Sequence, residues 1–324
     1  MTMPPGAGDP RSAQGASRTE LEELLHRVRK ALAARDEDPT GAWVEESVGE
    51  LTGGSKPGWY LLPPEAGGIA FYARRGTAAF AHLHADGGLA AARALAGALL
   101  DHLPAELATV DLGFSGLSGE EERNLVDELL QRPGSLAIAR EALERTLTAA
   151  DGRAPGEPPP GVERLPLRAV TVEALAELDR VAFAGSVDEL LLGREPDAHR
   201  RSLEALLGSQ LGRFLEEASC ALLEAEPTRL VGAVLCSERS SRRAIVLDLM
   251  VDPARRRHGL GRYLLAWALR ALWALGYESV VLWASLENAP ALALYRSAGF
   301  RTRLAATIYR WERPGPAAQP HASR

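Results

Sequence analysis

The first half of the chain alternates between helical and extended hydrophobic patterns. An apolar stripe at helical spacing follows a Thr19/Glu22 capping box and predicts a helix; it comprises Leu21, Leu24, Leu25, Val28 and Leu32. From residue 43 to 85, short apolar runs broken by Gly and Pro predict an antiparallel meander, with strands at 59–62, 69–72 and 78–83. A helix at 89–100, a strand at 109–112 and a helix at 120–130 are expected to follow.

The second half interleaves strands and helices more regularly. The pattern predicts strands at 165–170, 220–225, 230–237, 245–251 and 280–283, with one or two closing strands at 301–310. Helices are expected at 172–192 and 197–217, with a break between them, and at 260–275 and 289–297. Hairpins and crossovers both occur, so the fold class is α/β with a mixed (α+β) sheet. A similar order of elements in both halves indicates a duplicated domain.

Residues 151–161 interrupt this pattern most clearly. Four prolines and three glycines in eleven residues cannot sustain a helix or a central strand. We interpret 151–163 as a linker between a first domain at 19–150 and a second at 164–312. Residues 1–18, rich in Gly, Pro, Ala and Ser, are expected to be a disordered tail, and 313–324 a C-terminal tail.

Composition narrows the class of protein. With 324 residues and 46% hydrophobic content, the chain can form two cores of roughly 150 residues. A net charge of -6 disfavours a nucleic-acid partner, and no apolar run approaches the ~20 residues of a membrane span. Cys220 and Cys236 lie in apolar runs without metal or redox spacing, and no signal-peptide segment begins the chain. We therefore expect buried thiols, no metal site and a cytoplasmic protein.

One strand-to-helix junction can bind an anion. The strand ends at Val251, Asp252-Pro253 forces a turn, and the run Arg256-Arg-His-Gly-Leu-Gly261 enters a helix. A helix start leaves N–H groups without partners, and its dipole favours an anion by about 0.3–2 kcal/mol. The glycines allow close approach of a pyrophosphate. The pattern is neither a Walker loop nor a complete dinucleotide fingerprint, since no Gly-Lys-Ser/Thr and no third glycine follow.

A second motif follows the next strand. Asn288 is a good N-cap, Pro290 suits a first helical turn, and Gly299 is a natural C-cap. Tyr295 falls seven residues after Asn288, so both lie on about the same helix face. Taken alone, Tyr295 would be interpreted as a core aromatic.

Together the two motifs resemble the GNAT superfamily of acyl-CoA N-acyltransferases. Its Arg/Gln-x-x-Gly-x-Gly/Ala signature is matched by Arg256, Gly259 and Gly261. Its later helix is matched by Asn288, Ala291, Tyr295, Gly299 and Phe300. The resemblance implies a tandem GNAT-like fold with a degenerate first copy; the layout and the closing Thr307-Ile-Tyr-Arg310 are similar to the mycothiol synthase subfamily of tandem proteins.

The resemblance also implies a role for each matched residue, with acetyl-CoA as acyl donor. Backbone groups of Leu249, Met250 and Val251 are expected to pair with the pantetheine amides. The pyrophosphate is expected to lie on the loop of Arg256, Arg257, His258, Gly259, Leu260, Gly261 and Arg262. Asn288 is expected to orient the cofactor and Tyr295 to protonate the leaving thiolate.

The general base is where the sequence departs from the family pattern. Members often carry Glu or His at positions that correspond to Ile245 and Leu247, both aliphatic here. Asp248 is the only ionisable residue within 245–251, and strand alternation points it away from the Leu247 face. A β-bulge could re-aim it, which makes Asp248 the candidate base or substrate contact. A water relay or a carboxylate such as Glu217 are the alternatives.

The function expected from the resemblance is acetyl transfer to a primary amine of a small molecule, a peptide or a protein. A catalytically silent acyl-CoA-binding or interaction module is the alternative, and a longer acyl group is also open, because the motif binds only the CoA portion. No nucleic acid or membrane partner is expected, and a homodimer stays open.

The first copy is expected not to bind acetyl-CoA. Its corresponding junction reads His84-Ala-Asp86-Gly87-Gly88-Leu89, with adjacent glycines and no arginine, and Asp86 would repel a phosphate. His82 and His84 alternate on one strand without a third ligand, so they are interpreted as hydrogen-bonded strand histidines.

Overall fold

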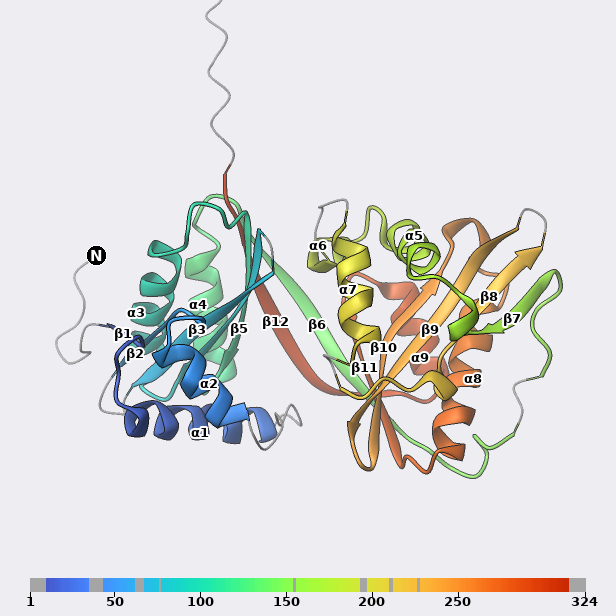
Figure 1. Cartoon of the computed structure of the whole chain (residues 1–324), viewed down its shortest axis with the longest axis horizontal. Coiled ribbons are helices and arrows are strands. Elements are labelled where there is room, and N and C mark those ends of the chain that lie inside the picture. Colours follow the sequence, from blue (N-terminus) through green and yellow to red (C-terminus); the bar gives the residue numbers. More distant parts are fainter. Residues whose placement is uncertain are drawn as a thin grey trace, which may run out of the picture. The chain divides into compact units, whose positions relative to one another are not determined.

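The computed structural model describes residues 10–34, 43–61, 67–75, 77–153, 156–192, 197–209, 212–225 and 228–314 (Figure 1). By Cα packing the chain divides into two units. The first combines Met1–Ile138 with Thr307–Arg324, and the second comprises Ala139–Ala306. The chain therefore passes from one unit to the other inside two long strands, β6 and β12. These two units are defined by packing alone. The domain boundaries expected at 150 and 164 therefore stay a prediction.

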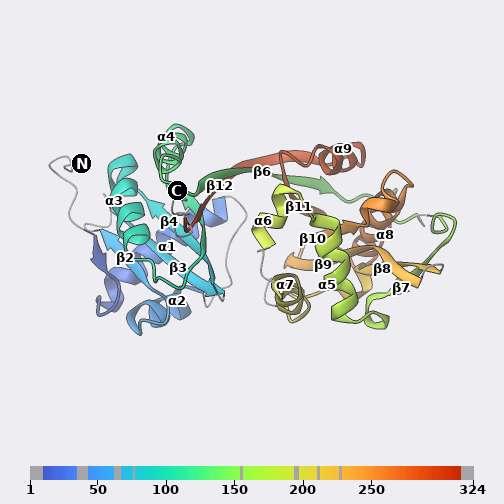
Figure 2. The same ribbon diagram turned by 90° about the horizontal axis from the view of Figure 1, so that it is seen from above.

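The first unit is a mixed sheet between two pairs of helices. In chain order its elements are β1 (Arg11–Ser12), α1 (Arg18–Ala34), α2 (Trp43–Thr52), β2 (Gly58–Leu61), β3 (Gly68–Arg75), β4 (Ala78–Ala85), α3 (Gly88–Asp101), β5 (Thr109–Ser115) and α4 (Gly119–Leu129). The predicted meander β2-β3-β4 is confirmed, and β4 and β5 are parallel because α3 crosses between them. Separate cores lie under α3 and α4 and under α1 and α2, which cover opposite faces (Figure 2).

The second unit has the same layered plan. Its elements are β6 (Ser135–Thr146), β7 (Val162–Pro166), α5 (Val172–Phe183), α6 (Val187–Leu192), α7 (Ala198–Leu207), β8 (Cys220–Ala225), β9 (Thr228–Ser240), β10 (Arg243–Val251), α8 (Leu260–Ala274), β11 (Ser279–Ser285), α9 (Ala289–Ser297) and β12 (Arg301–Glu312). The sheet order is β6-β11-β10-β9-β8-β7, with β10 and β11 parallel. Helices α5 and α7 lie on one face and α8 on the other (Figure 2). The predicted mixed α/β class is confirmed.

The two units exchange their closing strands. β6 follows α4 in the chain but pairs with β11 of the second unit, whereas the end of β12 pairs with β5 of the first. In the first unit, Arg310 is 3% exposed and its guanidinium binds both carboxylate oxygens of Asp111 at 2.5 Å. This bidentate pair fixes the register of β12 on β5.

Several sequence expectations were wrong. Residues 43–52 form α2 rather than extended structure; Val44, Val48 and Leu51 have helical spacing and are buried. The prediction of a disordered tail at 1–18 is wrong at 11–13, where β1 pairs with β2 and Ala13 is buried. Residues 1–9 lie outside the described residues. β7 begins at Val162, inside the expected linker at 151–163, and pairs with β8, whereas the linker itself stays a prediction. The long strand β6 was not predicted, because its burial follows no simple alternation.

The two thiols behave as predicted. Cys220 and Cys236 are both fully buried and unpaired, and burial raises the pKa of Cys220 to about 12. Among the described residues, no helix is long and apolar enough to cross a membrane, and no three potential ligands gather for a metal ion.

The strand histidines of the first unit form a satisfied polar cluster, as expected. His82 Nε2 and His84 Nδ1 both contact Ser115 Oγ, at 2.8 and 2.9 Å, and so join β4 to β5. His84 Nε2 lies 3.0 Å from Asp86 Oδ2, which Arg27 also binds at 2.7 Å. Asp86 is therefore held by two cationic or hydrogen-bonding partners inside its own unit. His84 is 1% exposed, and burial lowers its pKa although Asp86 opposes the shift.

This cluster makes stability sensitive to mild acid. Below about pH 6.5 the unfolded chain binds a proton at His84 that the folded chain resists, so the free energy of unfolding falls as pH drops through that window. We expect the urea midpoint to fall less for His84→Gln than for wild type between about pH 7.5 and 5.5. His26→Gln, at an exposed helix position, is the control and should keep the wild-type slope. Equal slopes in all three proteins would contradict the prediction.

Candidate active site

The loop between β10 and α8 leaves a helix N-terminus open to a ligand. Gly259, at the N-cap position of α8, has φ +83°, and no described side chain caps this helix. A Cβ on Gly259 would meet no described atom within 4 Å, so there is free space beside this glycine. The first N–H groups of the helix receive no hydrogen bond from a capping side chain. Arg257 also adopts a positive φ of 67°, which turns the backbone sharply just before Gly259. This geometry fits the phosphates of acetyl-CoA.

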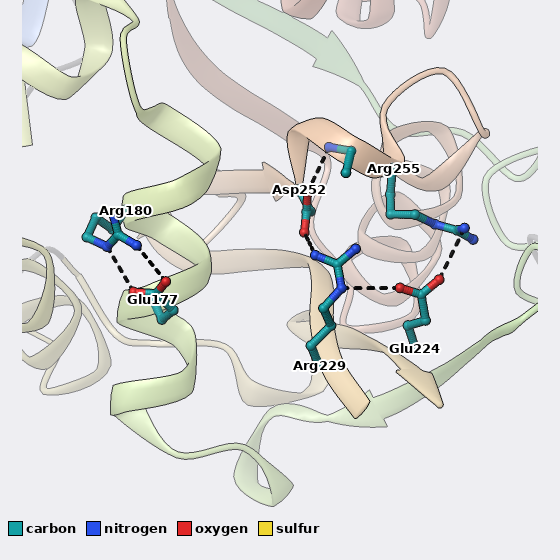
Figure 3. Close-up of polar contacts among 7 residues, drawn as sticks. Glu177, Arg180, Glu224, Arg229, Asp252 and Arg255 are labelled. Carbon is teal, nitrogen blue, oxygen red and sulfur yellow. Dashed lines mark hydrogen bonds and ion pairs between the residues drawn. The ribbon is translucent and has the colours of Figure 1, made fainter. Parts of the chain in front are cut away.

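A chain of ion pairs fixes the turn that enters this loop (Figure 3). Asp252 is 4% exposed; it accepts a hydrogen bond from the Ala254 N–H at 2.7 Å and pairs with Arg229. Arg229 also contacts Glu224 at 3.3 Å, and Glu224 in turn binds Arg255 at 3.1 Å. Strands β8 and β9 thus hold both ends of the turn at 252–255.

The arginines of the loop differ in their surroundings. Arg256 does not extend freely into solvent: its Nη2 donates to the Ala182 carbonyl at 2.6 Å and links the loop to the end of α5. The His258 ring lies 2.8 Å from the Arg256 carbonyl. Arg257 and Arg262 are exposed, and neither has an ion-pair partner among the described residues. Their guanidinium groups can therefore reach an anionic ligand.

Strands β10 and β11 separate beside this loop. Their parallel pairing runs from Arg243↔Ser279 to Val246↔Leu282 and stops, although β10 continues to Val251 and β11 to Ser285. Backbone groups of β10 beyond Val246 are thus left without pairing to β11. A pantetheine arm bound there could add amide hydrogen bonds as a further strand would.

A β-bulge in β10 brings Asp248 to the same place. The register with β9 shifts between Val246 and Asp248, leaving Leu247 as the extra residue. Val246 faces the core under α8, whereas Leu247 and Met250 pack on the α5 side. A bulge directs consecutive side chains to similar sides, so Asp248 can lie against α5 next to Leu247. The bulge that was considered for this strand is present.

Asp248 lies in an unusual electrostatic environment. Burial raises its pKa well above the usual range, and the neighbouring carboxyl group of Asp179 on α5 raises it further. Asp188 on α6 adds a smaller effect of the same sign. A carboxyl whose pKa is raised is a stronger proton acceptor than an ordinary carboxylate once it is ionised.

Asp188 is held by the last residue of β11 and by the residue that caps α9. Ser285 Oγ donates to Asp188 Oδ1, and Asn288 Nδ2 donates to Oδ2 at 3.2 Å. Asn288 Oδ1 also caps α9 by accepting from the Ala291 N–H at 3.3 Å. Asn288 therefore positions both α9 and a carboxylate, a role that the sequence did not reveal.

Tyr295 on α9 faces the same carboxylates. It is 7% exposed, and burial, followed by the charges of Asp248 and Asp188, raises its pKa. The phenol is thus kept protonated, as an acid must be. Arg140 on β6 interacts with Tyr295 and Asp188; burial lowers its pKa, and its Nε is buried without a hydrogen-bond partner among the described residues.

The structure thus brings the predicted Asp248, Tyr295 and Asn288 together and adds residues that the sequence analysis missed. The additions are Asp179, Asp188, Arg140 and the buried His199 on α7, which lie in segments without a legible motif. Glu217 is exposed, and its electrostatic neighbour is Arg213 rather than Asp248. The catalytic and cofactor roles stay predictions.

Sequence comparison matches part of the second half of the chain to a known family. Residues 185–300, from α6 to the end of α9, match the sequence model described as "Acetyltransferase (GNAT) family". The chain carries a GNAT acetyltransferase domain. This match contains the open loop, Asp248 and Tyr295, whereas the first unit lies outside it.

Curated relatives support the same family. The mycothiol acetyltransferase of Clavibacter sepedonicus is 33% identical over 184 residues, which cover 56% of this chain and 54% of that protein. The mycothiol acetyltransferase of Clavibacter michiganensis subsp. michiganensis is 49% identical over 67 residues, which cover 21% of this chain and 22% of that protein. The chain thus spans about half the length of one relative and about a fifth of the other.

Solved structures show the tandem fold over nearly the whole chain. A GCN5-related N-acetyltransferase from Sphaerobacter thermophilus has a TM-score of 0.65 at 19% identity, covering 97% of this chain and 98% of that one. A tandem GNAT protein from the clavulanic acid biosynthesis pathway has a TM-score of 0.56 at 14% identity, covering 95% and 98%. At these identities the likeness shows the fold alone.

The ion pairs below the loop yield a stability prediction. Arg229→Leu leaves the carboxylates of Asp252 and Glu224 without their shared cation, and both are largely buried. We expect the free energy of unfolding to fall by about 1–3 kcal/mol, as measured by urea denaturation. Arg180→Leu is the matched control, because Arg180 and Glu177 form an exposed pair on α5 (Figure 3); its effect should stay within about 0.5 kcal/mol. Equal effects in both variants would contradict this role.

Proposed function

We propose that this protein is an N-acetyltransferase that moves an acetyl group from acetyl-CoA to a primary amine. The acceptor would be a small molecule, a peptide or a protein, and it would attack the thioester directly. The observation that carries the proposal is the open N-terminus of α8 at Gly259, beside the gap where β10 and β11 separate. Asp248 and Tyr295, which interact electrostatically, supply a base and an acid at that gap.

Different backbone groups would bind different parts of the cofactor. N–H groups from Arg257 to Arg262 would hold the pyrophosphate, with exposed arginine side chains adding charge. Backbone groups of Leu249, Met250 and Val251 would bind the pantetheine amides. Bound acetyl-CoA supplies an activated acyl group.

The charges around the gap favour an amine acceptor. Asp248 and Asp188 present carboxyl groups near the Tyr295 hydroxyl, an environment that attracts a cation. Asp248 takes one proton from the ammonium group, and the neutral nitrogen then forms its bond to the acetyl carbon as the C–S bond breaks. Tyr295 donates its hydroxyl proton to the leaving sulfur and recovers one from the nitrogen. The proton on Asp248 is released to water, so one proton leaves per turnover.

The proposal assigns one cofactor site to each chain. In the first unit, the Glu121 carboxylate lies at the corresponding helix start, beside the Leu89 N–H of α3. Its Oε1 lies 2.8 Å from where a Cβ on Gly88 would be. Glu121 also accepts from the Ser118 N–H at 2.9 Å, and these bonds hold its pKa below the usual range. A built-in carboxylate occupies the position that a phosphate would need.

Calorimetry of acetyl-CoA binding tests the cofactor site. We expect one site per chain, and at least about tenfold weaker binding in Gly259→Leu, because the new side chain enters the free space of the loop. Gly276→Leu is the matched control: Gly276 ends the same helix with φ +87° and equally open surroundings, so both variants carry similar backbone strain.

Two sites per chain would show that the first unit also binds the cofactor. Equal loss in both variants would attribute the effect to strain rather than to the loop. Absence of binding in the wild type would leave a GNAT-shaped interaction module.

The acid is tested by Tyr295→Phe. Removing the hydroxyl should lower kcat by about 10²–10⁴-fold with little change in acetyl-CoA affinity, because the ring and its packing on Phe300 remain. The release of CoA thiol is measured with a panel of α-amines and lysine-type amines. Tyr263→Phe, a buried tyrosine of α8, is the control and should retain activity. A Tyr295→Phe enzyme with wild-type kcat would exclude Tyr295 as the acid.

A further inference from the structure

A buried pair of an aspartate and a histidine lies behind Asp248. Asp179 on α5 is 1% exposed and His199 on α7 is 6% exposed. His199 Nδ1 lies 2.6 Å from Asp179 Oδ2, and α5 packs along α7. Burying such a pair costs free energy unless its hydrogen bonds are complete. A pair kept in this position therefore calls for a role beyond packing.

The second oxygen of Asp179 points to that role. Oδ1 is buried and has no donor among the described residues, while α5 packs on β10 and the Asp179 carboxyl is an electrostatic neighbour of the Asp248 carboxyl. Two ionised carboxylates offer only acceptors, so this contact becomes a hydrogen bond when one of them carries a proton. Burial, the largest cause, raises the pKa of Asp179 as well as that of Asp248. When the pair binds one proton, the two carboxyls therefore share it.

We propose that Asp179 and His199 are positioning residues for the general base: they hold Asp248 toward the gap between β10 and β11 and share a proton with it. The inference rests on the proposed function. Asp248 takes the acceptor's proton into the Asp248–Asp179 hydrogen bond, and it returns that proton to solvent after the amide has formed. His199, hydrogen-bonded to Oδ2, orients the far side of Asp179.

The neighbouring charged groups are compatible with this assignment. Asp188 from α6 disfavours ionisation of Asp248, and Tyr295 from α9 stays protonated beside it. Arg140 from β6 faces Asp188 and Tyr295 and partly compensates them. Asp179 is the neighbour with the largest effect on Asp248, so it is the residue whose change should move the titration of the base.

The pH dependence of kcat/KM in Asp179→Asn tests the inference. The amide oxygen of the variant can still accept from His199 while its NH₂ group donates to Asp248, which keeps the geometry but removes the shared proton. The acidic limb of the profile should move to lower pH by at least about one unit, with the plateau within a few-fold of wild type. A uniform loss at every pH, with the limb unmoved, would overturn the proposal. Glu177→Gln, exposed on the same helix, should match wild type.

Titration of Asp248 by ¹³C NMR in the substrate-free protein separates this inference from the proposed function. A lower pKa of Asp248 in Asp179→Asn would support the shared proton. If no amine is acetylated in that case, only the proposed function fails. If the enzyme is active but the Asp248 titration is the same in both proteins, the inference fails alone.

Variants of His199 provide a second test should Asp179→Asn not fold. His199→Phe removes the donor to Asp179 and should lower kcat/KM by at least about tenfold. In His199→Asn the side-chain amide can replace Nδ1 as donor and should restore most of that loss. Equal losses in the two variants would overturn the positioning role.

Discussion

The β-bulge at Leu247 is the constraint on which the candidate site depends. Before it, Ala244 and Val246 face the core under α8; after it, Met250 faces the core under α5 and α7. The extra residue lets Asp248 approach α5. Pairing with β11 ends at Val246, one residue before the bulge. The inserted residue Leu247 thus lies where β10 and β11 separate, and it also changes the direction of the Asp248 carboxyl group.

The two units differ in what lies at one equivalent helix start. Each has a glycine-containing junction between a strand and a helix, and each helix start has unpaired N–H groups that favour an anion. In the first unit the anion is the Glu121 carboxylate, supplied by α4. In the second, Gly259 leaves the start of α8 open. A carboxylate of the protein can thus lie at a helix start in the place that a bound anion would otherwise take.

In the second unit, ion pairs stabilise the turn before the loop, whereas buried carboxyl groups nearby lower the stability of the fold. The turn before the loop is tied to β8 and β9 by alternating charges, and Arg256 joins the loop to α5. Nearby, Asp248 is buried beside the carboxyl groups of Asp179 and Asp188, and both disfavour its ionisation. Such a cluster disfavours folding, and the hydrogen bonds from His199, Ser285 and Asn288 offset part of that cost. Crowded charges of this kind are typical of functional sites rather than of structural ones.

The sequence by itself determined the parts that local chemistry encodes. Helical spacing, capping residues and glycine turns were sufficient for most strands and helices, for the loop at Gly259 and for the helix bearing Tyr295. Tertiary structure decided the rest. The exchange of β6 and β12 depends on pairing between distant segments, which no local pattern records. Asp179, Asp188 and His199 are ordinary polar residues in their own helices. Packing of α5 on β10 and of α7 on α5 brings Asp179 and His199 together near Asp248, and Ser285 and Asn288 hold Asp188 nearby. No residue type reveals this site, because burial and proximity set the pKa of a carboxyl group.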